Sequence, residues 1–436
     1  MSQTESPAGE PPEVSQVVEH LFRHEAGKIV ATLTHIFGIE HLTLAEDVLQ
    51  EALARALQTW PFHGVPQNPS AWIMRTARNL ALDVVRRQKV FRDKEPEIVR
   101  LLEGAETMPD SPGNSEGEIA DDRLRMMFVC CHPQVPPADQ VALALKILCG
   151  FSVTEISRAF LTTDAAIAKR LTRAKQKIRE AGIVFEIPGG VELEQRLGGV
   201  WQSLYLLFNE GYKASGGDKL VREDICKEAI RLTSLLAEHP VGDKPGTHAL
   251  LALMLLNTAR LPARVDNQGN LLRLREQDRA LWSQPLMARG MFHATKSAAG
   301  DQITAYHLEA AIAACHCATE DYESTNWRQI LSLYDRLIEI DDSPIGALNR
   351  AVALAEVHGP QAAIETIEGM ANRRSLESYY LLPALLGEFE WRLNHFETAA
   401  AHFQKARQLA EIKSEQVFLE RRLQDCQKKL TPANSA

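Results

Sequence analysis

Apolar side chains recur at helical spacing along most of the chain. The pattern predicts helices over residues 14–90, over 121–183 and, after the break at Pro188-Gly189-Gly190, over most of the remainder. No segment shows the alternation of apolar and polar residues that a series of β-strands would require. Alanine, leucine, glutamate and arginine, which dominate these segments, suit helices. The sequence therefore predicts an all-α fold.

The most specific local pattern lies between residues 150 and 183. Ser152-Val153-Thr154-Glu155 has the form of a capping box and predicts a short helix over 153–160. Leu161-Thr162-Thr163 is a predicted turn, in which Thr163 caps a second helix. The second helix has small residues at its start, basic residues beyond them, and a buried face formed by Ile167, Leu171, Ala174 and Ile178. Such a pair is typical of a helix-turn-helix, although a solvated amphipathic helix is the alternative.

A second basic stretch covers residues 75–94, where seven lysines and arginines accompany two aspartates. Most of it belongs to a helix predicted to begin near Ser70, after a loop from Pro61 to Ser70 that contains three prolines and a glycine. The predicted core stripe of this helix is Ile73, Ala77, Leu80 and Val84. Two separate basic helices indicate a bipartite grip on nucleic acid.

The positive charge of these helices is local, because the 436-residue chain has a formal net charge of −9. Residues 95–122 contain nine acidic residues and one arginine, together with prolines, glycine, serine and asparagine. This composition predicts a linker. An acidic chain with two basic helices is a poor candidate for general coating of DNA.

The C-terminal third contains a weak internal repeat. Gly387, Ala399 and Phe403 show the alternation of small and large residues that lets two helices approach closely. Ala363 lies 36 residues before Ala399, and Ile330 lies 33 before Ala363. These offsets bracket the 34-residue period of tetratricopeptide repeats, so we expect helical hairpins over 327–410.

We predict no metal and no cofactor. Cys130-Cys131-His132 and Cys315-His316-Cys317 bring metal-capable residues together, but neighbouring helical residues point about 100° apart and cannot close one tetrahedral site. The odd number of scattered cysteines favours reduced core thiols. Neither a phosphate-binding glycine loop nor a nucleophile motif is present, so we do not expect an enzyme.

The sequence also predicts a cytoplasmic protein. It has no run of about 18 apolar residues that would span a membrane. Its start, MSQTESPAGEPPE, is acidic and proline-rich, unlike a signal peptide.

With these motifs in place, the chain resembles a known family. AEDVLQEALARALQTW (45–60) is similar to the polymerase-docking helix of sigma factor region 2, and NPSAWIMRTARNLALDVVRRQ (68–88) to the following helix, which engages the −10 promoter element. Residues 150–183 resemble region 4, which reads the −35 element. Together with segments 205–215, 248–266, 275–282 and 308–316, the order resembles the long extracytoplasmic-function (ECF) sigma factors of the sigma-70 family, which carry a tetratricopeptide-like extension.

Two segments depart from the pattern of that family. Most of its members have a glycine in the region 4 turn, where this chain has Phe160-Leu161-Thr162. Residues 287–300 match only loosely.

The resemblance implies a non-catalytic initiation factor that binds core RNA polymerase and directs transcription from promoters with −10 and −35 elements. It implies two small helical domains, a linker and a helical extension. The expected divisions are a tail (1–13), region 2 (14–94), the acidic linker (95–122), region 4 (123–186), a helical extension domain (187–326), tetratricopeptide-like repeats (327–425) and a second tail (426–436).

Site residues follow from the same resemblance. Those expected to dock on RNA polymerase are Asp47, Gln50 and Glu51. Those expected at the −10 element are Trp72, Arg75, Arg78, Asn79 and Arg86, with the loop from Pro61 to Ser70 receiving an extruded base. Those expected at the −35 element are Thr163, Ala165, Lys169, Arg170 and Arg173. Trp72 is a stacking platform in one interpretation and a core residue in the other, and the sequence leaves open which cations read bases.

The extension is expected to regulate activity through intramolecular contacts with regions 2 and 4. Within it, Asn209-Glu210-Gly211-Tyr212 and Arg264-Val265-Asp266 form either a ligand pocket or a helix end with a satisfied ion pair. A classical DNA-binding regulator or a tetratricopeptide adaptor would explain only part of the chain.

Overall fold

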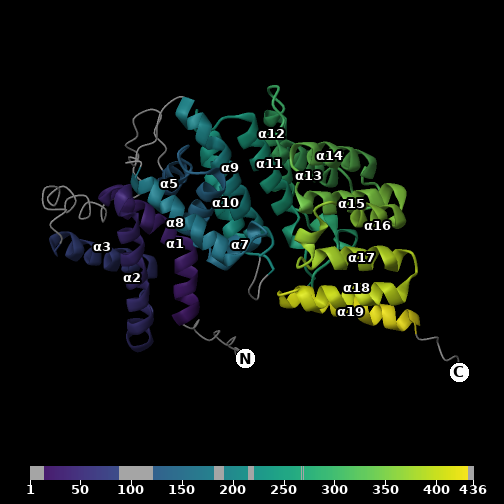
Figure 1. Ribbon diagram of the computed structural model, residues 1–436, viewed down its shortest axis with the longest axis horizontal. Helices are drawn as coiled ribbons and strands as arrows, with labels where there is room; N and C mark the ends of the chain where they lie inside the picture. Colours follow the sequence, from purple (N-terminus) through teal and green to yellow (C-terminus); the bar gives the residue numbers. More distant parts are fainter. Residues whose placement is uncertain are drawn as a thin grey trace, which may run out of the picture. The chain divides into compact units, whose positions relative to one another are not determined.

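The computed structural model describes residues 14–87, 121–180, 191–214, 220–266, 268 and 270–430. Apart from one isolated bridge between Val265 and Leu271, the regular structure in these ranges is helical, which confirms the predicted all-α fold (Figure 1). The chain forms two compact units, Met1–Ser203 and Leu204–Ala436. The predicted N-terminal tail and residues 95–120 of the predicted linker lie outside the described ranges. Within them, no helix combines the length and apolar character needed to cross a membrane.

Unit 1 begins with three long helices that pack on one another around an apolar core. Their bounds are α1 (Val14–Phe37), α2 (Leu42–His63) and α3 (Pro69–Arg87), with a short 3-10 turn, η1 (Ile39–His41), between the first two. Leu49, Leu53, Ala56 and Trp60 form the buried face of α2. The spacing of 4, 3 and 4 residues keeps this stripe on one side of the helix.

Two details of the prediction for this segment are wrong. The loop does not begin at Pro61, because α2 continues through Pro61 to His63 and is capped by Gly64, which has a φ of 80°. A proline in the last turn removes only one N–H from the helix, and the Gly64 N–H still bonds to the Trp60 carbonyl at 2.9 Å. The core stripe of α3 also differs, since it follows four-residue steps through Ile73, Ala77, Ala81 and Val85, which leaves Leu80 and Val84 half-buried.

Four further helices follow in unit 1: α5 (Asp122–Cys130), α6 (Pro137–Leu148), α7 (Val153–Ala159) and α8 (Asp164–Glu180). The last two, α7 and α8, form the predicted helix-turn-helix. The capping box at the start of α7 is confirmed, with Ser152 and Glu155 bonded reciprocally. The turn contains Leu161 at a φ of 48°, a conformation that suits glycine better. This chain therefore has a leucine with positive φ in the turn where a glycine was expected.

The first half of α9 (Val191–Tyr212) belongs to unit 1 and packs against α5 and α6. Gly199 allows this approach, because a Cβ there would lie 2.7 Å from Gln140 Oε1 and 2.9 Å from Cys131 Sγ. The buried Arg196 guanidinium donates to the Phe128 carbonyl at 3.2 Å. The predicted boundary of region 4 at residue 186 therefore leaves out a segment that helps to form this unit.

Helix α1 also packs directly on the helix-turn-helix half of unit 1. A Cβ on Gly27 would lie only 2.1 Å from the Leu148 carbonyl oxygen, so α1 approaches α6 at backbone distance. The Thr32 hydroxyl donates to Asp122 at 3.3 Å, and His35 lies 3.8 Å from the same carboxylate. The pKa of Asp122 is lowered despite its burial, because His35, Arg125 and Thr32 stabilise the charged form. The α1–α3 and α5–α8 halves therefore form one closed unit.

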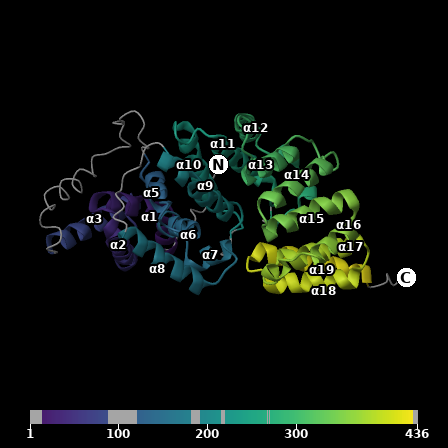
Figure 2. The same cartoon turned by 45° about the horizontal axis from the view of Figure 1, so that its top comes forward.

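Unit 2 continues from the second half of α9 into a series of helices in which each of the later members packs on the next (Figure 2). The first group is α10 (Glu223–Glu238), α11 (Pro245–Ala259), α12 (Gln284–Ser297) and α13 (Ala305–Cys317), with the short turns η3 (Leu261–Ala263), η4 (Leu274–Glu276) and η5 (Arg279–Leu281). The second group is α14 (Trp327–Ile340), α15 (Pro344–His358), α16 (Pro360–Glu368), η6 (Arg373–Leu376), α17 (Leu381–Arg392), α18 (Phe396–Leu409) and α19 (Lys413–Leu430).

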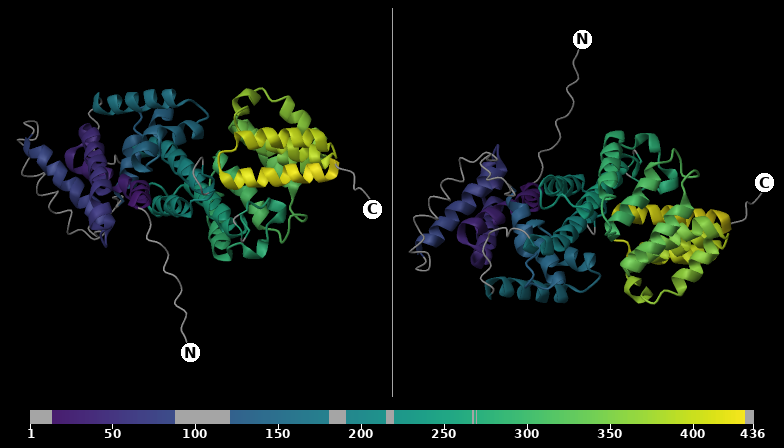
Figure 3. Two further views of the ribbon diagram at one scale, coloured as in Figure 1. Left: turned by 90° about the horizontal axis from the view of Figure 1, so that it is seen from below. Right: turned by 90° about the horizontal axis from the view of Figure 1, so that it is seen from above.

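The small residues of the predicted repeat lie at close contacts between helices in this second group. Ala363 and Ala399 are fully buried. A Cβ on Gly387 would lie 2.9 Å from the Phe403 ring, so the glycine allows α17 and α18 to pack closely. The last three helices lie side by side (Figure 1, Figure 3), and α19 extends to Leu430, inside the predicted tail.

Residues 209–212 and 264–266 are the two segments for which the sequence left open a ligand pocket or a satisfied helix end. In the structure these segments contact one another. Glu210 pairs with Arg222 at 3.2 Å, and both side chains are largely buried. Arg264 lies over the Tyr212 ring at 4.1 Å and donates to the Tyr212 carbonyl at 2.5 Å. These contacts favour the satisfied helix end over the pocket.

His316 is expected to lower the stability of unit 2 as the pH falls from about 7 to 5. Burial, with help from Arg260 and Arg279, lowers the pKa of His316 to about 3. Because this folded-state pKa lies below that of the unfolded chain, the unfolded chain takes up a proton first, and one such histidine costs about 2 kcal/mol at pH 5. The melting temperature should change less between pH 7 and pH 5 in the His316→Phe variant than in the wild type. The phenylalanine keeps a ring against Trp327. Equal pH dependence in both proteins would contradict this assignment.

Candidate nucleic-acid and polymerase interfaces

The start of α8 presents a free, polar helix end. The Thr163 hydroxyl accepts from the Ala166 N–H at 3.3 Å, as the predicted cap requires. Asp164 accepts from Ser157 and Thr154 of α7 at 2.5 and 2.7 Å, and these hydrogen bonds lower the pKa of its carboxyl group. The two helices are therefore tied together at their turn. Thr163 and Ala165 are exposed, which leaves this end accessible to a DNA groove.

The basic residues of α8 differ in what they contact. Lys169 is exposed and no protein group in the described ranges pairs with it. Arg170 is half-buried, with its guanidinium 5.4 Å from the centre of the Phe160 ring. Arg173 donates to both oxygens of Asp139 at 2.6 and 2.7 Å, and Asp139 is only 1 % exposed. Of these three cations, Lys169 is thus the one that is exposed without a protein partner in the described part of the chain, whereas Arg173 holds α8 on α6.

One further cation of α8 connects the two halves of unit 1. Lys175 pairs with Glu46 of α2 at 2.6 Å, and both side chains are mostly buried. Neither residue was singled out from the sequence, because the pairing joins positions 129 residues apart. In this closed arrangement, Lys175 contacts protein rather than nucleic acid.

On α3, the residues predicted to meet the −10 element divide into two groups. Arg75, Asn79 and Arg86 are exposed, and their spacing of four and seven residues puts them on one face. Arg78 and Trp72 are half-buried. The Trp72 ring lies edge-on to buried Trp60, with 5.4 Å between ring centres, which favours the interpretation of Trp72 as part of the core.

A residue that the sequence reasoning missed lies next to the predicted loop. Phe62, in the last turn of α2, is 84 % exposed. Two residues correspond to about 200° of helical rotation, so Phe62 points away from the stripe that ends at Trp60. The sequence contained a signal for this residue, because Phe62 is aromatic, lies off the core stripe and is next to a proline-containing loop. Phe62 therefore presents an exposed aromatic ring beside this loop.

The predicted polymerase-docking residues share the exposed side of α2. Asp47, Gln50 and Glu51 are all exposed, opposite the buried Leu49, Leu53 and Ala56, as the pattern predicted. Glu51 pairs with Arg55 at 2.9 Å, a surface contact of small energetic value. The result is an accessible acidic and amide face.

The described residues contain no group of three or more His, Cys, Asp or Glu side chains that could hold a metal ion. Of the seven cysteines, six are buried and Cys315 is half-buried, and all are free thiols. Burial raises the pKa of Cys131 to about 12 and that of Cys130 well above its usual range. Both thiols of this pair are therefore structural rather than reactive.

Three family models match successive parts of the chain. The family model for sigma-70 region 2 matches residues 21–90, that for sigma-70 region 4 matches 125–178, and that of a family of unknown function, DUF6596, matches 196–298. The chain is 38 % identical over 396 residues, 88 % of its length and 90 % of the relative's, to the uncharacterized protein R00370 of Rhizobium meliloti (strain 1021).

A second relative has a name that states its function. The chain is 26 % identical over 162 residues to the ECF RNA polymerase sigma factor SigE of Mycolicibacterium smegmatis (strain ATCC 700084 / mc(2)155), which corresponds to 37 % of this chain and 60 % of the relative. No solved structure matches. With region 2 on α1–α3, region 4 on α5–α8 and a helical extension after them in the sequence, the chain belongs to the extracytoplasmic-function sigma factors of the sigma-70 family, which act in transcription initiation.

Proposed function

We propose that this sigma factor binds core RNA polymerase through α2 and directs initiation at promoters with −10 and −35 elements, which α3 and α8 engage. The observation that carries the proposal is the pairing, in one chain, of an exposed acidic face on α2 with a capped and accessible helix end on α8. Gel filtration with sigma-free core polymerase tests the docking step, for which we expect co-elution. Separate elution at micromolar concentrations would contradict it. Such a function places the protein in the cytoplasm.

At the −10 element, Phe62 is proposed to stack on a base that leaves the duplex. Stacking on an aromatic side chain contributes about 1–3 kcal/mol per base. Phe62→Ala is therefore expected to reduce promoter opening about tenfold or more, measured by the permanganate reactivity of −10 thymines. Phe62→Tyr keeps the ring and should retain opening. Equal opening by the alanine variant would contradict this role.

At the −35 element, Lys169 is proposed to contact a phosphate, with Thr163 and Ala165 beside the base edges. Lys169→Ala should weaken binding of holoenzyme to all promoters alike, and the slope of log affinity against log salt should fall by about 1. Gln176→Ala, an exposed change on the same helix, serves as the control. An unchanged slope would show that Lys169 does not meet the backbone.

The same function requires unit 1 to open. Elements named −10 and −35 lie about 25 base pairs apart, which is about 85 Å of duplex. A compact unit of about 200 residues has a radius of gyration of only about 17 Å. Regions 2 and 4 must therefore separate at the α1–α6 and Glu46–Lys175 contacts before both elements can be bound.

Regulation by the extension remains part of the proposal. The helices of unit 2 provide the stacked arrangement from which repeat proteins form binding surfaces. We propose that contacts of this extension with regions 2 and 4 set whether they engage polymerase, and that α14–α19 are tetratricopeptide-like. The acidic linker, most of which lies outside the described ranges, is proposed to follow polymerase channels that otherwise accommodate nucleic acid.

A further inference from the structure

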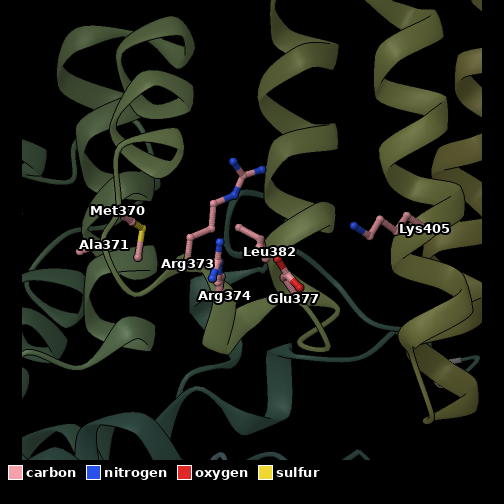
Figure 4. Close-up of a pocket in the computed structure, with 7 residues that line it drawn as sticks. All are labelled: Met370, Ala371, Arg373, Arg374, Glu377, Leu382 and Lys405. Carbon is pink, nitrogen blue, oxygen red and sulfur yellow. The ribbon is translucent and has the colours of Figure 1, made fainter.

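Unit 2 contains a pocket of about 350 Å³ between η6, the start of α17 and the middle of α18 (Figure 4). Arg373 and Arg374 come from η6 and Lys405 from α18, while Met370 and Leu382 supply apolar surface and Glu377 is the one acidic side chain. In Figure 4 the Lys405 ammonium group points from its helix toward the η6 residues. Three cations and one anion thus surround a cavity that is partly apolar.

These cations lack the partners that neighbouring arginines have. Within the described ranges, no ion pair or side-chain hydrogen bond involves Arg373, Arg374 or Lys405. By contrast, four other arginines of the group α14–α19 have carboxylate partners at 2.6–3.0 Å, namely Arg350 with Asp335, Arg392 with Glu356, Arg407 with Glu420, and Arg422 with Glu388. Cations gathered without counter-charges around a cavity favour an anionic ligand.

A nearby histidine is sensitive to the same positive charge. His402, half-buried on α18, has a lowered pKa, first because of burial and then because Lys405 and Arg373 repel its protonated form, against the opposing effect of Glu390 and Glu368. Arg373 of η6 and Lys405 of α18 therefore both contribute positive charge to the space around His402. Their shared field would also act on a ligand in the pocket.

We propose that this pocket binds a short acidic segment of a protein partner, with carboxylates on Arg373, Arg374 and Lys405 and an apolar side chain against Met370 and Leu382. The volume lies at the low end of the range for ligand sites, about 300–1,000 Å³, and suits a few side chains. Arginine clusters recognise acidic motifs in this way. None of the lining residues is aromatic, so the pocket lacks the stacking surfaces that single-stranded nucleic acid uses.

The test is fluorescence anisotropy with the full-length protein and a fluorescein-labelled peptide, Glu-Glu-Leu-Asp-Glu-Leu-Asp, at low salt. We expect saturable binding that weakens about tenfold or more in Arg373→Gln/Arg374→Gln/Lys405→Gln, because each charged hydrogen bond is worth about a factor of ten. Arg374 and Lys405 are exposed, so the variant should fold, and its melting temperature checks this. Lys227→Gln/Lys428→Gln/Lys429→Gln changes the net charge equally at exposed positions outside the pocket and should bind as the wild type does.

Four results would overturn the proposal: no saturable binding of the peptide, equal loss in the control variant, equal binding of the peptide with Gln and Asn in place of Glu and Asp, or stronger displacement by a seven-nucleotide oligonucleotide than by unlabelled peptide. The last result would assign the pocket to nucleic acid. This inference goes beyond the proposed function, and the assay contains neither polymerase nor promoter. Its failure is therefore distinguishable from failure of the sigma factor mechanism.

Discussion

Oxidation of a Thr32→Cys/Asp122→Cys variant is expected to abolish transcription from a promoter with both elements. The wild-type side chains at these positions lie 3.3 Å apart, oxygen to oxygen, across the contact between α1 and α5. A disulfide there would hold regions 2 and 4 closed. Because the closed unit is about half as long as the distance between the two promoter elements, the locked protein cannot engage both.

The measurement compares one protein in two redox states. The variant is oxidised, freed of oxidant and assayed with core polymerase before and after addition of a thiol reductant, and activity should return on reduction. Wild-type protein treated identically controls for oxidation of native cysteines, six of which are buried. Full activity of the cross-linked form would contradict the requirement for opening.

Gly27→Leu, which pushes α1 away from the Leu148 carbonyl, should act in the opposite sense and strengthen binding to core polymerase.

Removal of the whole segment after residue 186 is expected to damage region 4 itself. The first half of α9 buries Leu193, Leu197 and Val200, and burial of each such side chain contributes about 1.5–3 kcal/mol. A chain of residues 1–186 should therefore unfold at lower temperature than a chain of residues 1–203. It should also expose Cys131, which is 1 % exposed in the intact protein, to a thiol reagent. Equal protection of Cys131 in both chains would contradict this packing role.

The longer truncation then isolates the effect of the extension. Residues 1–203 form compact unit 1, so transcription by this chain compares regions 2 and 4 with and without unit 2. We expect a clear difference from full-length protein, in either direction. Indistinguishable activity would contradict regulation by the extension.

Local patterns allowed the helices and the helix-turn-helix to be predicted. The capping box at Ser152 and the alternating four- and three-residue steps of the buried face of α8 depend on neighbouring residues, so they are readable from the sequence. The exposed positions of Asp47, Gln50 and Glu51 followed from the same helical periodicity. By contrast, the extension of α2 through Pro61 was missed, because a proline in a final turn costs much less than one in a helix interior.

The roles of individual cations were not readable, because they depend on partners far away in the sequence. Arg173 was expected to meet DNA beside Lys169, yet it binds Asp139, which is 34 residues away. Lys175 binds Glu46 across an even longer separation. Helical periodicity gives the direction of a side chain but not the group that faces it. The half of α9 that joins unit 1 was missed for the same reason.

Reconstituted transcription tests the central claim most directly. Full-length protein is mixed with sigma-free bacterial core polymerase and a library of genomic promoter fragments, and the 5′ ends of the transcripts are mapped. The account predicts discrete start sites that share two upstream elements about 25 base pairs apart and that disappear when the protein is omitted. Start sites that do not depend on the protein, or none at all together with no binding to core polymerase, would contradict it.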